Sequence, residues 1–244
     1  MKRHLVLAVV LTCSLPGLWA AQTPKPQDTA ALDAILKKMD EASANFHTTQ
    51  ADFEWDTYQK VIDEVDDVKT GVVYYRRAGK NIEMMAEVKK AGDSAASTKP
   101  FPEYVLFAGG KIQLYEPKPD RITEVDLSKS HFDWETYLVL GFGGSGQDLK
   151  KNFDVTYQGS EDINGIKAAK LELIPKSEKV KNTYSRIVLW IDPDRGISVQ
   201  QKFFSPQGDY KLAKYPNIKI NEKIPEGVFK LKTTSKTEIV QPVG

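Results

Sequence analysis

The residues from Leu189 to Tyr210, LWIDPDRGISVQQKFFSPQGDY, predict two β-hairpins in immediate succession. The first strand stops at Asp192-Pro193-Asp194-Arg195-Gly196, and the second stops at Ser205-Pro206-Gln207-Gly208. Proline presets the φ angle of a turn and glycine reaches positive φ without strain, so both breaks have the chemistry of tight turns. The stretch therefore indicates three antiparallel strands, and it contains no catalytic motif.

Alternation of apolar and polar residues, which is typical of half-buried strands, recurs along most of the chain. Phe53 and Trp55, for example, share one face of a strand whose other face carries Asp52 and Glu54. Further strands are predicted at residues 51–57, 72–77, 82–88, 104–107, 112–115, 153–157 and 169–173. About ten or eleven short strands of this kind predict one large antiparallel sheet, strongly curved or closed.

Two segments have helical periodicity instead. Thr29–Asn45 is predicted to form an amphipathic helix, because its apolar residues recur at intervals of three and four. These residues are Leu32, Ile35, Leu36 and Met39. A second helix is predicted at Phe132–Leu140, and the glycine-rich run GFGGSG (residues 141–146) follows it as a flexible connector.

The first twenty residues are typical of a secretory signal peptide. Lys2 and Arg3 precede an apolar stretch, Leu5–Leu11, and small residues follow at Ala20 and Ala21. We expect cleavage after Ala20, or alternatively after Ala21. The remaining chain divides into a flexible lead-in at residues 21–28 and a single domain at residues 29–244, and the expected location is the periplasm.

Cysteine and charge exclude several classes of function. The only cysteine, Cys13, lies in the predicted signal, and Thr12 differs from the Gly, Ala or Ser expected before a lipidated cysteine. The mature chain would then have no disulfide, no zinc-cysteine site and no catalytic thiol. Without Lys2 and Arg3 the 34 basic residues become 32 against 33 acidic residues. This balance gives no reason to expect nucleic acid or an anionic membrane as partner.

No reactive site stands out. His47 and His131 are isolated, so a histidine-rich metal centre is not expected. GFGGSG lacks the Lys-Ser/Thr end of a phosphate loop, and Asp192-Pro193-Asp194 lacks the later ligands of a calcium loop. The acidic row beside Phe53 and Trp55 is what a solvated strand face requires. We therefore predict no enzyme activity, no cofactor and no metal ion.

The remaining feature is the shape of the sheet. A helix followed by a curved sheet with an apolar stripe on nearly every strand forms a concavity, which has two interpretations. The helices fill it as ordinary core, or it is an apolar ligand cavity with the helices as its lid. The residues predicted to line such a cavity are Phe53, Trp55, Tyr75, Ile82, Met84, Leu106, Ile112, Leu114, Leu171, Leu173, Leu189, Ile191 and Phe203.

Five segments, in order, resemble the LolA family of periplasmic carriers of outer-membrane lipoproteins. They are FHTTQADFEW (46–55), KTGVVYYRRAGKNIEMM (69–85), YVLFAGGKIQLYEP (104–117), LELIPKSEKVKNTYSRIVLWID (171–192) and YPNIKINEKIPEGVFKLKTT (215–234). The order and spacing of the segments carry the resemblance, since no single motif is specific. Gly109 stands where the family usually has Asp, and Arg77-Ala78 stands where it has Arg-Pro, with Arg76 as an alternative alignment.

The resemblance implies an incomplete, half-open antiparallel barrel of about eleven strands, covered by a helical lid, with a cavity for acyl chains. It also implies that Arg77 faces the lid, where it would donate hydrogen bonds to carbonyl groups at a helix end. The implied partners are acyl chains of lipoproteins or other lipids, an inner-membrane releasing complex and an outer-membrane acceptor. The protein is expected to be a monomer.

Three functions remain open at this point. A carrier that delivers lipoproteins or related lipids to the outer membrane is the first. A periplasmic lipid- or lipoprotein-binding sensor or adaptor like the RseB relatives of the family is the second. A secreted enzyme is a distant third, because no acid–base pair for it is found.

Overall fold

A computed structural model describes residues 26–78, 81–127 and 140–241 of the 244-residue chain. Its helices are α1 (Pro26–Ala44), α3 (Gly146–Asn152) and α4 (Glu178–Lys181). The first six strands are β1 (Thr48–Gln59), β2 (Glu64–Ala78), β3 (Asn81–Gly92), β4 (Lys99–Ala108), β5 (Lys111–Glu116) and β6 (Arg121–Asp126). The later strands are β7 (Phe153–Ile163), β8 (Ile166–Pro175), β9 (Arg186–Asp192), β10 (Ile197–Phe204), β11 (Tyr210–Lys214), β12 (Lys219–Ile220) and β13 (Glu238–Val240).

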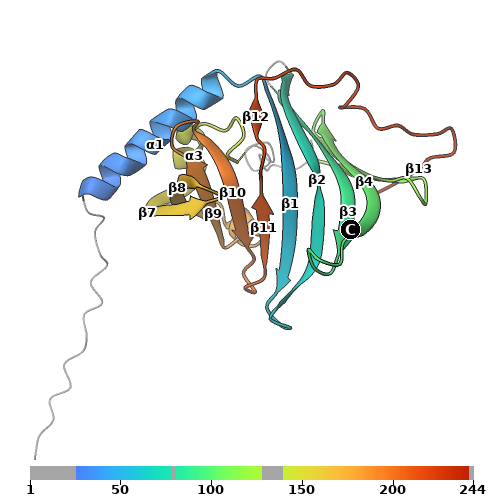
Figure 1. Ribbon diagram of the computed structural model, residues 1–244, viewed down its shortest axis with the longest axis horizontal. Coiled ribbons are helices and arrows are strands. Elements are labelled where there is room, and N and C mark those ends of the chain that lie inside the picture. The colour runs from blue at the N-terminus through green and yellow to red at the C-terminus, as the bar shows by residue number, and fades with distance from the viewer. Residues whose placement is uncertain (1–25, 79–80, 128–139, 242–244) are drawn as a thin grey trace, which may run out of the picture.

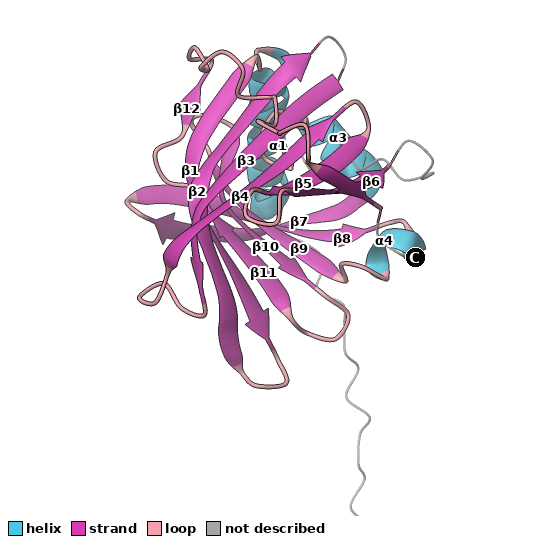
Figure 2. Ribbon diagram, turned by 90° about the vertical axis from the view of Figure 1, so that its right-hand side faces the viewer, coloured by secondary structure: helices cyan, strands magenta, loops and turns pink. Residues whose placement is uncertain are grey.

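The strands form one continuous sheet in the order β13-β6-β5-β4-β3-β2-β1-β11-β10-β9-β8-β7, and the short β12 also pairs with β1. Two meanders, β1–β6 and β7–β11, are joined by the antiparallel pairing of β1 with β11, in which Trp55 lies opposite Ala213. All described pairs are antiparallel except β13 with β6. The sheet is strongly twisted and remains open, with β7 and β13 at its edges (Figures 1 and 2). The predicted fold class, an incomplete antiparallel barrel with helices, is confirmed.

The two turns that join β9 to β10 and β10 to β11 form as predicted. In the β9–β10 turn the Asp192 carboxylate accepts hydrogen bonds from the backbone N–H of Asp194 at 2.9 Å and of Arg195 at 3.2 Å. The Arg195 guanidinium also donates to this carboxylate at 2.7 Å. Gly196 has a φ of 66°, and Gly208 in the next turn has a φ of 96°. Turn chemistry therefore accounts for the Asp-Pro-Asp sequence.

Helix α1 covers only one half of the concave face. Its buried residues Ile35, Leu36 and Met39 pack on the inner side chains of β7, β8 and β9. The contact is close, because a Cβ at Gly196 would lie 2.4 Å from the Lys38 carbonyl oxygen. The helix begins at Pro26, three residues before the predicted start and within the predicted flexible lead-in. Figure 1 shows α1 beside β7–β10, away from β2–β4.

The other half of the concave face, formed by β1–β5 and β11, is packed with a second apolar cluster. Phe53, Val73, Ile82 and Phe107 are buried in it, each with at most 6% of its surface exposed. Because no residue of α1 belongs to this cluster, α1 does not cover this half. The second helix predicted for the lid, Phe132–Leu140, lies outside the described residues except for Leu140, so only α1 is tested. The half that α1 leaves open contains the site described below.

The outer face of β2–β4 is also apolar, and the chain after β12 covers it. Val72, Tyr74, Met85 and Leu106 form a cluster with Phe229, against which Ile224, Val228 and Leu231 pack. Figure 1 shows this C-terminal segment in red, running from β12 to β13. This part of the convex side is thus covered by the protein's own chain.

Some sequence predictions lie outside the described residues. These are the signal peptide at residues 1–20, residues 21–25 of the lead-in, and the second predicted helix at Phe132–Leu140 except for Leu140 itself. The strand β6 is an addition to the prediction. Its apolar residues, Ile122 and Val125, are three apart and therefore give no period-two signal.

Candidate binding cavity

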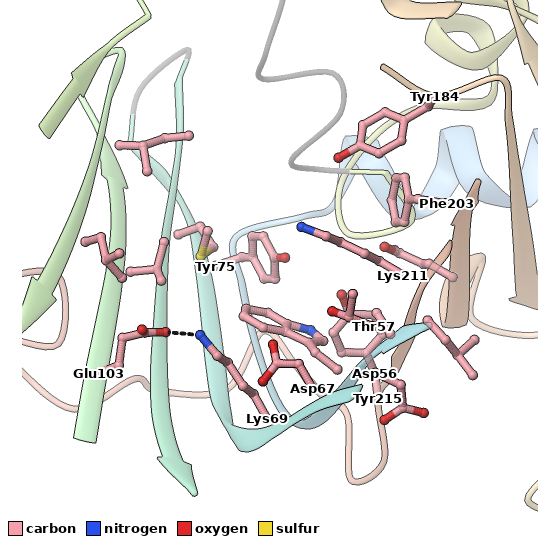
Figure 3. Close-up of a pocket in the computed structure, with 18 residues that line it drawn as sticks. Asp56, Thr57, Asp67, Lys69, Tyr75, Glu103, Tyr184, Phe203, Lys211 and Tyr215 are labelled. Carbon is pink, nitrogen blue, oxygen red and sulfur yellow. Dashed lines mark hydrogen bonds and ion pairs between the residues drawn. The ribbon is translucent and has the colours of Figure 1, made fainter. Parts of the chain in front are cut away.

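A cavity of about 510 Å³ opens on the concave face in the half that α1 leaves uncovered. Its lining residues come from β1–β5, β10 and β11 and from the loops that follow α4 and β11, and none belongs to α1, α3 or α4. The apolar lining residues are Trp55, Tyr75, Met84, Val105, Ile112, Leu114, Tyr184, Phe203, Leu212, Ala213 and Tyr215 (Figure 3). The wall is therefore largely aromatic and aliphatic, as in pockets for apolar ligands.

Three aromatic residues at the base of the cavity are linked by hydrogen bonds. Tyr75 and Tyr215 are buried and bonded to each other, and Trp55 donates its indole N–H to Tyr215. Burial raises the pKa of Tyr75 well above its usual range. Burial also raises the pKa of Tyr215, against the hydrogen bonds from Trp55 and Tyr75 that lower it. Both phenols remain protonated, so they offer no base for catalysis.

Phe142 packs behind two of the residues that line the cavity, Tyr75 and Tyr215. Its ring is fully buried, stacks on Tyr75 with centroids 5.1 Å apart, and meets Tyr215 edge-on at 4.7 Å. Gly141 and Gly143, with φ angles of 81° and 91°, shape the backbone on either side of it. The Gln201 amide holds this loop by donating to the Leu140 carbonyl. The glycine-rich run is thus a fixed wall element, which differs from the predicted flexible connector.

The charged residues at the cavity are mostly paired. Lys69 donates to the buried Glu103 at 2.8 Å, and Lys214 lies 2.8 Å from the buried Asp56 carboxylate. Figure 3 shows the Lys69–Glu103 pair at one side of the cavity, with Asp67 near it, while Lys211 reaches into the cavity on the side of Tyr184 and Phe203. Among the described residues, neither Lys211 nor Asp67 forms an ion pair.

The structure brings together part of the predicted lining set. Six of those residues line the cavity: Trp55, Tyr75, Met84, Ile112, Leu114 and Phe203. Phe53 stacks on Trp55 at 4.0 Å, and Ile82 is buried in the same cluster, both behind the lining. Leu171, Leu173, Leu189 and Ile191 lie under α1 and α3 instead. Leu106 lies on the outer face of the sheet, because Val105 and Phe107 are the inward residues of β4.

The sequence reasoning missed lining and wall residues of two kinds. Tyr184 and Phe142 lie in loops, where no periodicity marks them, although both are aromatic residues in otherwise polar or glycine-rich surroundings. Val105 and Ala213 lie in strands and follow the period-two pattern of their neighbours. The period-two pattern could therefore have placed these two residues on the inner face of the sheet.

Arg77 contacts the end of α1. Its Nε donates to the Phe46 carbonyl at 3.2 Å and its Nη2 to the Ser43 carbonyl at 3.3 Å, and the guanidinium lies 5.6 Å from the Phe46 ring centroid. Arg76 points to the outer face, where it pairs with Glu83 at 2.5 Å and lies over Phe229. Arg77 is thus the arginine that reaches the helix, and its part in opening or closing the cavity stays a prediction.

Within residues 26–78, 81–127 and 140–241, no cluster of His, Cys, Asp and Glu has the composition of a metal site. In the same part of the chain, every helix is too short or too polar to cross a membrane.

Comparison with known proteins gives few sequence matches. A family model described only as an uncharacterized protein matches residues 144–238, which is less than half of the chain. No curated protein matches.

Solved structures match over most of the chain. An uncharacterized conserved protein from Thermus thermophilus matches with a TM-score of 0.51 and 12% identity, over 87% of this chain and 99% of that one. MucB matches with a TM-score of 0.50 and 14% identity, over 86% of this chain and 66% of its own. A LolA superfamily protein from Nitrosomonas europaea matches with a TM-score of 0.39 and 14% identity, over 82% and 97%.

At identities of 12–14% these matches are evidence about the fold alone. The evidence comes from the two structures with TM-scores of 0.50 and 0.51. The open antiparallel sheet with a helix on its concave face agrees with the architecture expected from the sequence. The chain shares this fold with MucB and with the Thermus thermophilus protein.

Proposed function

We propose that the protein binds an acyl chain of a lipid or lipoprotein in the concave cavity and carries it through the periplasm. The observation that carries this proposal is the apolar cavity of about 510 Å³ in the half of the sheet that α1 leaves uncovered. Among the described lining residues, Glu103 and Asp56 are engaged by lysines, and most of the remaining wall is apolar. The apolar wall favours binding and shielding of an apolar chain.

The size of the cavity suits one chain. Its volume of about 510 Å³ lies within the range of roughly 300–1,000 Å³ that is typical of ligand pockets. Burial of a methylene contributes about 0.8 kcal/mol, so a chain of roughly 14 methylenes gains on the order of 11 kcal/mol before the costs of immobilisation. That free energy is enough for stable binding, and one chain is not bound so tightly that an acceptor could not remove it.

We expect the purified mature protein to take up a fluorescent fatty-acid analogue saturably, at about one site per chain, since the cavity accommodates one chain. Titration followed by fluorescence measures the stoichiometry, and long-chain acyl peptides should displace the probe. Equal displacement by short-chain competitors would contradict a cavity matched to a long chain. Mass spectrometry of lipids and lipoproteins that co-purify with the periplasmic protein would identify the cargo.

Delivery is the finer part of the proposal. A carrier would accept cargo from an inner-membrane releasing complex and pass it to an outer-membrane acceptor. Its depletion would then leave lipoproteins in the inner membrane, which fractionation of the two membranes measures. A normal distribution after depletion would argue against delivery.

A second function is favoured by the likeness to MucB, which has also been solved in complex with MucA. On that model the protein would bind a lipid or lipoprotein and pass a signal to a protein partner. Depletion would then alter an envelope-stress response without moving lipoproteins between membranes. The same depletion experiment therefore separates the two functions.

The contacts of Arg77 with α1 lead to a prediction about release. We propose that the bonds from Arg77 to the end of α1 stabilise a closed form of the protein that is less able to accept cargo. Hydrogen bonds from a guanidinium to carbonyls contribute about 1 kcal/mol when partly exposed, and in Arg77→Leu the closed form loses them. The equilibrium then shifts by about fivefold toward the open form that accepts cargo. We expect cargo to bind at least as tightly and to leave more slowly, which stopped-flow displacement measures.

Arg76→Leu is the matched control, because Arg76 lies on the outer face with Glu83 and Phe229. It should leave the release rate unchanged. Release from Arg77→Leu at the rate of the unmodified protein would remove Arg77 from the mechanism.

A further inference from the structure

Of the two lysines that line the cavity, Lys69 is paired with Glu103, whereas Lys211 forms no ion pair among the described residues. It lies on β11, directly opposite Thr57 of β1 and Phe203 of β10. Residues in such register have side chains close enough to act on one ligand. Figure 3 shows the Lys211 side chain reaching into the cavity on the side of Tyr184 and Phe203.

The surroundings of Lys211 offer further hydrogen-bond donors. Among the described residues, the hydroxyl groups of Tyr184 and Thr57 line the cavity without a hydrogen-bond partner. Burial raises the pKa of Tyr184, so its phenol stays protonated and can donate. The Tyr184 ring is held by Phe203, with centroids 5.3 Å apart. A cation and two hydroxyls thus border one side of an apolar chamber.

The nearby acidic side chains do not pair with Lys211. Glu103 is bound by Lys69, and Asp56 by Lys214. Asp67 lies opposite Thr57 on β2, one strand further from Lys211, and Figure 3 shows it on the side of Lys69. Lys211 is therefore the cation of the cavity that is available to a ligand.

We propose that the cavity selects a single-chain amphiphile with an anionic polar end, and that Lys211, Tyr184 and Thr57 bind this anionic end while the chain occupies the apolar chamber. The inference rests on the proposed function, since it presupposes that the chamber takes an acyl chain. A carboxylate or a phosphate ester satisfies the same donors, because both present oxygen acceptors to an ammonium group. An uncharged polar end leaves Lys211 without a counter-charge.

The experiment compares two ligands of equal chain length, palmitate and 1-monopalmitoylglycerol. At about pH 8, both are titrated by calorimetry against the full mature protein and against Lys211→Gln. We expect the substitution to weaken palmitate binding roughly five- to thirtyfold, the effect of one charge-assisted hydrogen bond, and to leave the uncharged ligand within about twofold. Lys211→Arg should retain most of the palmitate affinity, because it keeps the charge.

Lys230→Gln is the matched control, since Lys230 is an exposed lysine of the C-terminal segment outside the cavity. Failure of the unmodified protein to bind either ligand would overturn the proposed function itself. Binding of both ligands with no effect of Lys211→Gln would overturn the role of Lys211 and leave acyl binding intact. If Lys211→Gln weakened the binding of both ligands equally, the role of Lys211 would also be overturned. A contact with the anionic end must affect palmitate more than the uncharged ligand. Palmitate-selective weakening that Lys211→Arg reverses would support it.

Discussion

Replacement of Leu114 by glutamate is expected to weaken acyl-chain binding by about 100-fold or more, the largest effect on binding that we predict. Leu114 lies on β5 opposite Val105 and lines the cavity, where its side chain is half-buried. A carboxylate there is hydrated in the empty protein and must lose water when a chain enters, which costs about 3 kcal/mol or more. Fluorescent fatty-acid titration measures the change.

Ile239→Glu provides the control for this result. Ile239 is also an aliphatic residue of the sheet, but it lies on β13 outside the cavity and is 63% exposed. We expect the Ile239→Glu variant to bind the fluorescent fatty acid as tightly as the unmodified protein does. Because Leu114 is only half-buried, its variant should still unfold cooperatively in urea. Undiminished binding by Leu114→Glu would show that the chain binds elsewhere.

Replacement of Phe142 by alanine is expected to lower the free energy of unfolding by about 3–5 kcal/mol, the largest effect on stability that we predict. The ring is fully buried between Tyr75 and Tyr215, and Gly141 and Gly143 fix the backbone on both sides of it. Its removal leaves a void behind Tyr75 and Tyr215 that such a loop fills poorly. Urea unfolding followed by tryptophan fluorescence measures the loss.

Phe101→Ala tests whether this loss comes from burial. Phe101 lies on β4 and is 40% exposed, so its truncation should cost less than about 1 kcal/mol. Equal losses for the two phenylalanines would contradict the wall role that the packing gives to Phe142.

The fold could be predicted from the sequence because its signals are local. Strand β1 alternates from Ala51 to Trp55 and β8 from Ala169 to Leu173, and the turns between β9, β10 and β11 contain the glycines that positive φ requires. Helix α1 follows the 3.6-residue period, and its predicted apolar face is the buried one. Where the local signal is weak, as in β6 with Ile122 and Val125 three apart, the prediction failed.

The cavity could be predicted only in part, since periodicity assigns a residue to a face but not to a place on that face. Leu171 and Leu189 point inward as Trp55 does, yet α1 covers them and leaves Trp55 open to the cavity. In the run Tyr104–Phe107 both faces are apolar because the C-terminal segment buries the outer one. Alternation therefore could not separate Leu106 from Val105, and only the tertiary structure does so.

The pairing of β1 with β11 has a consequence for how the chain folds. Glu54 and Lys214 meet across this seam although 160 residues separate them in the chain. The cavity wall therefore has its first strand near the beginning of synthesis and its last strand near the end. Contacts between such distant residues slow folding, and strands that wait for their partners have exposed edges that promote aggregation. The cavity is thus among the last parts of the molecule to form, and a chain interrupted before β11 would lack it.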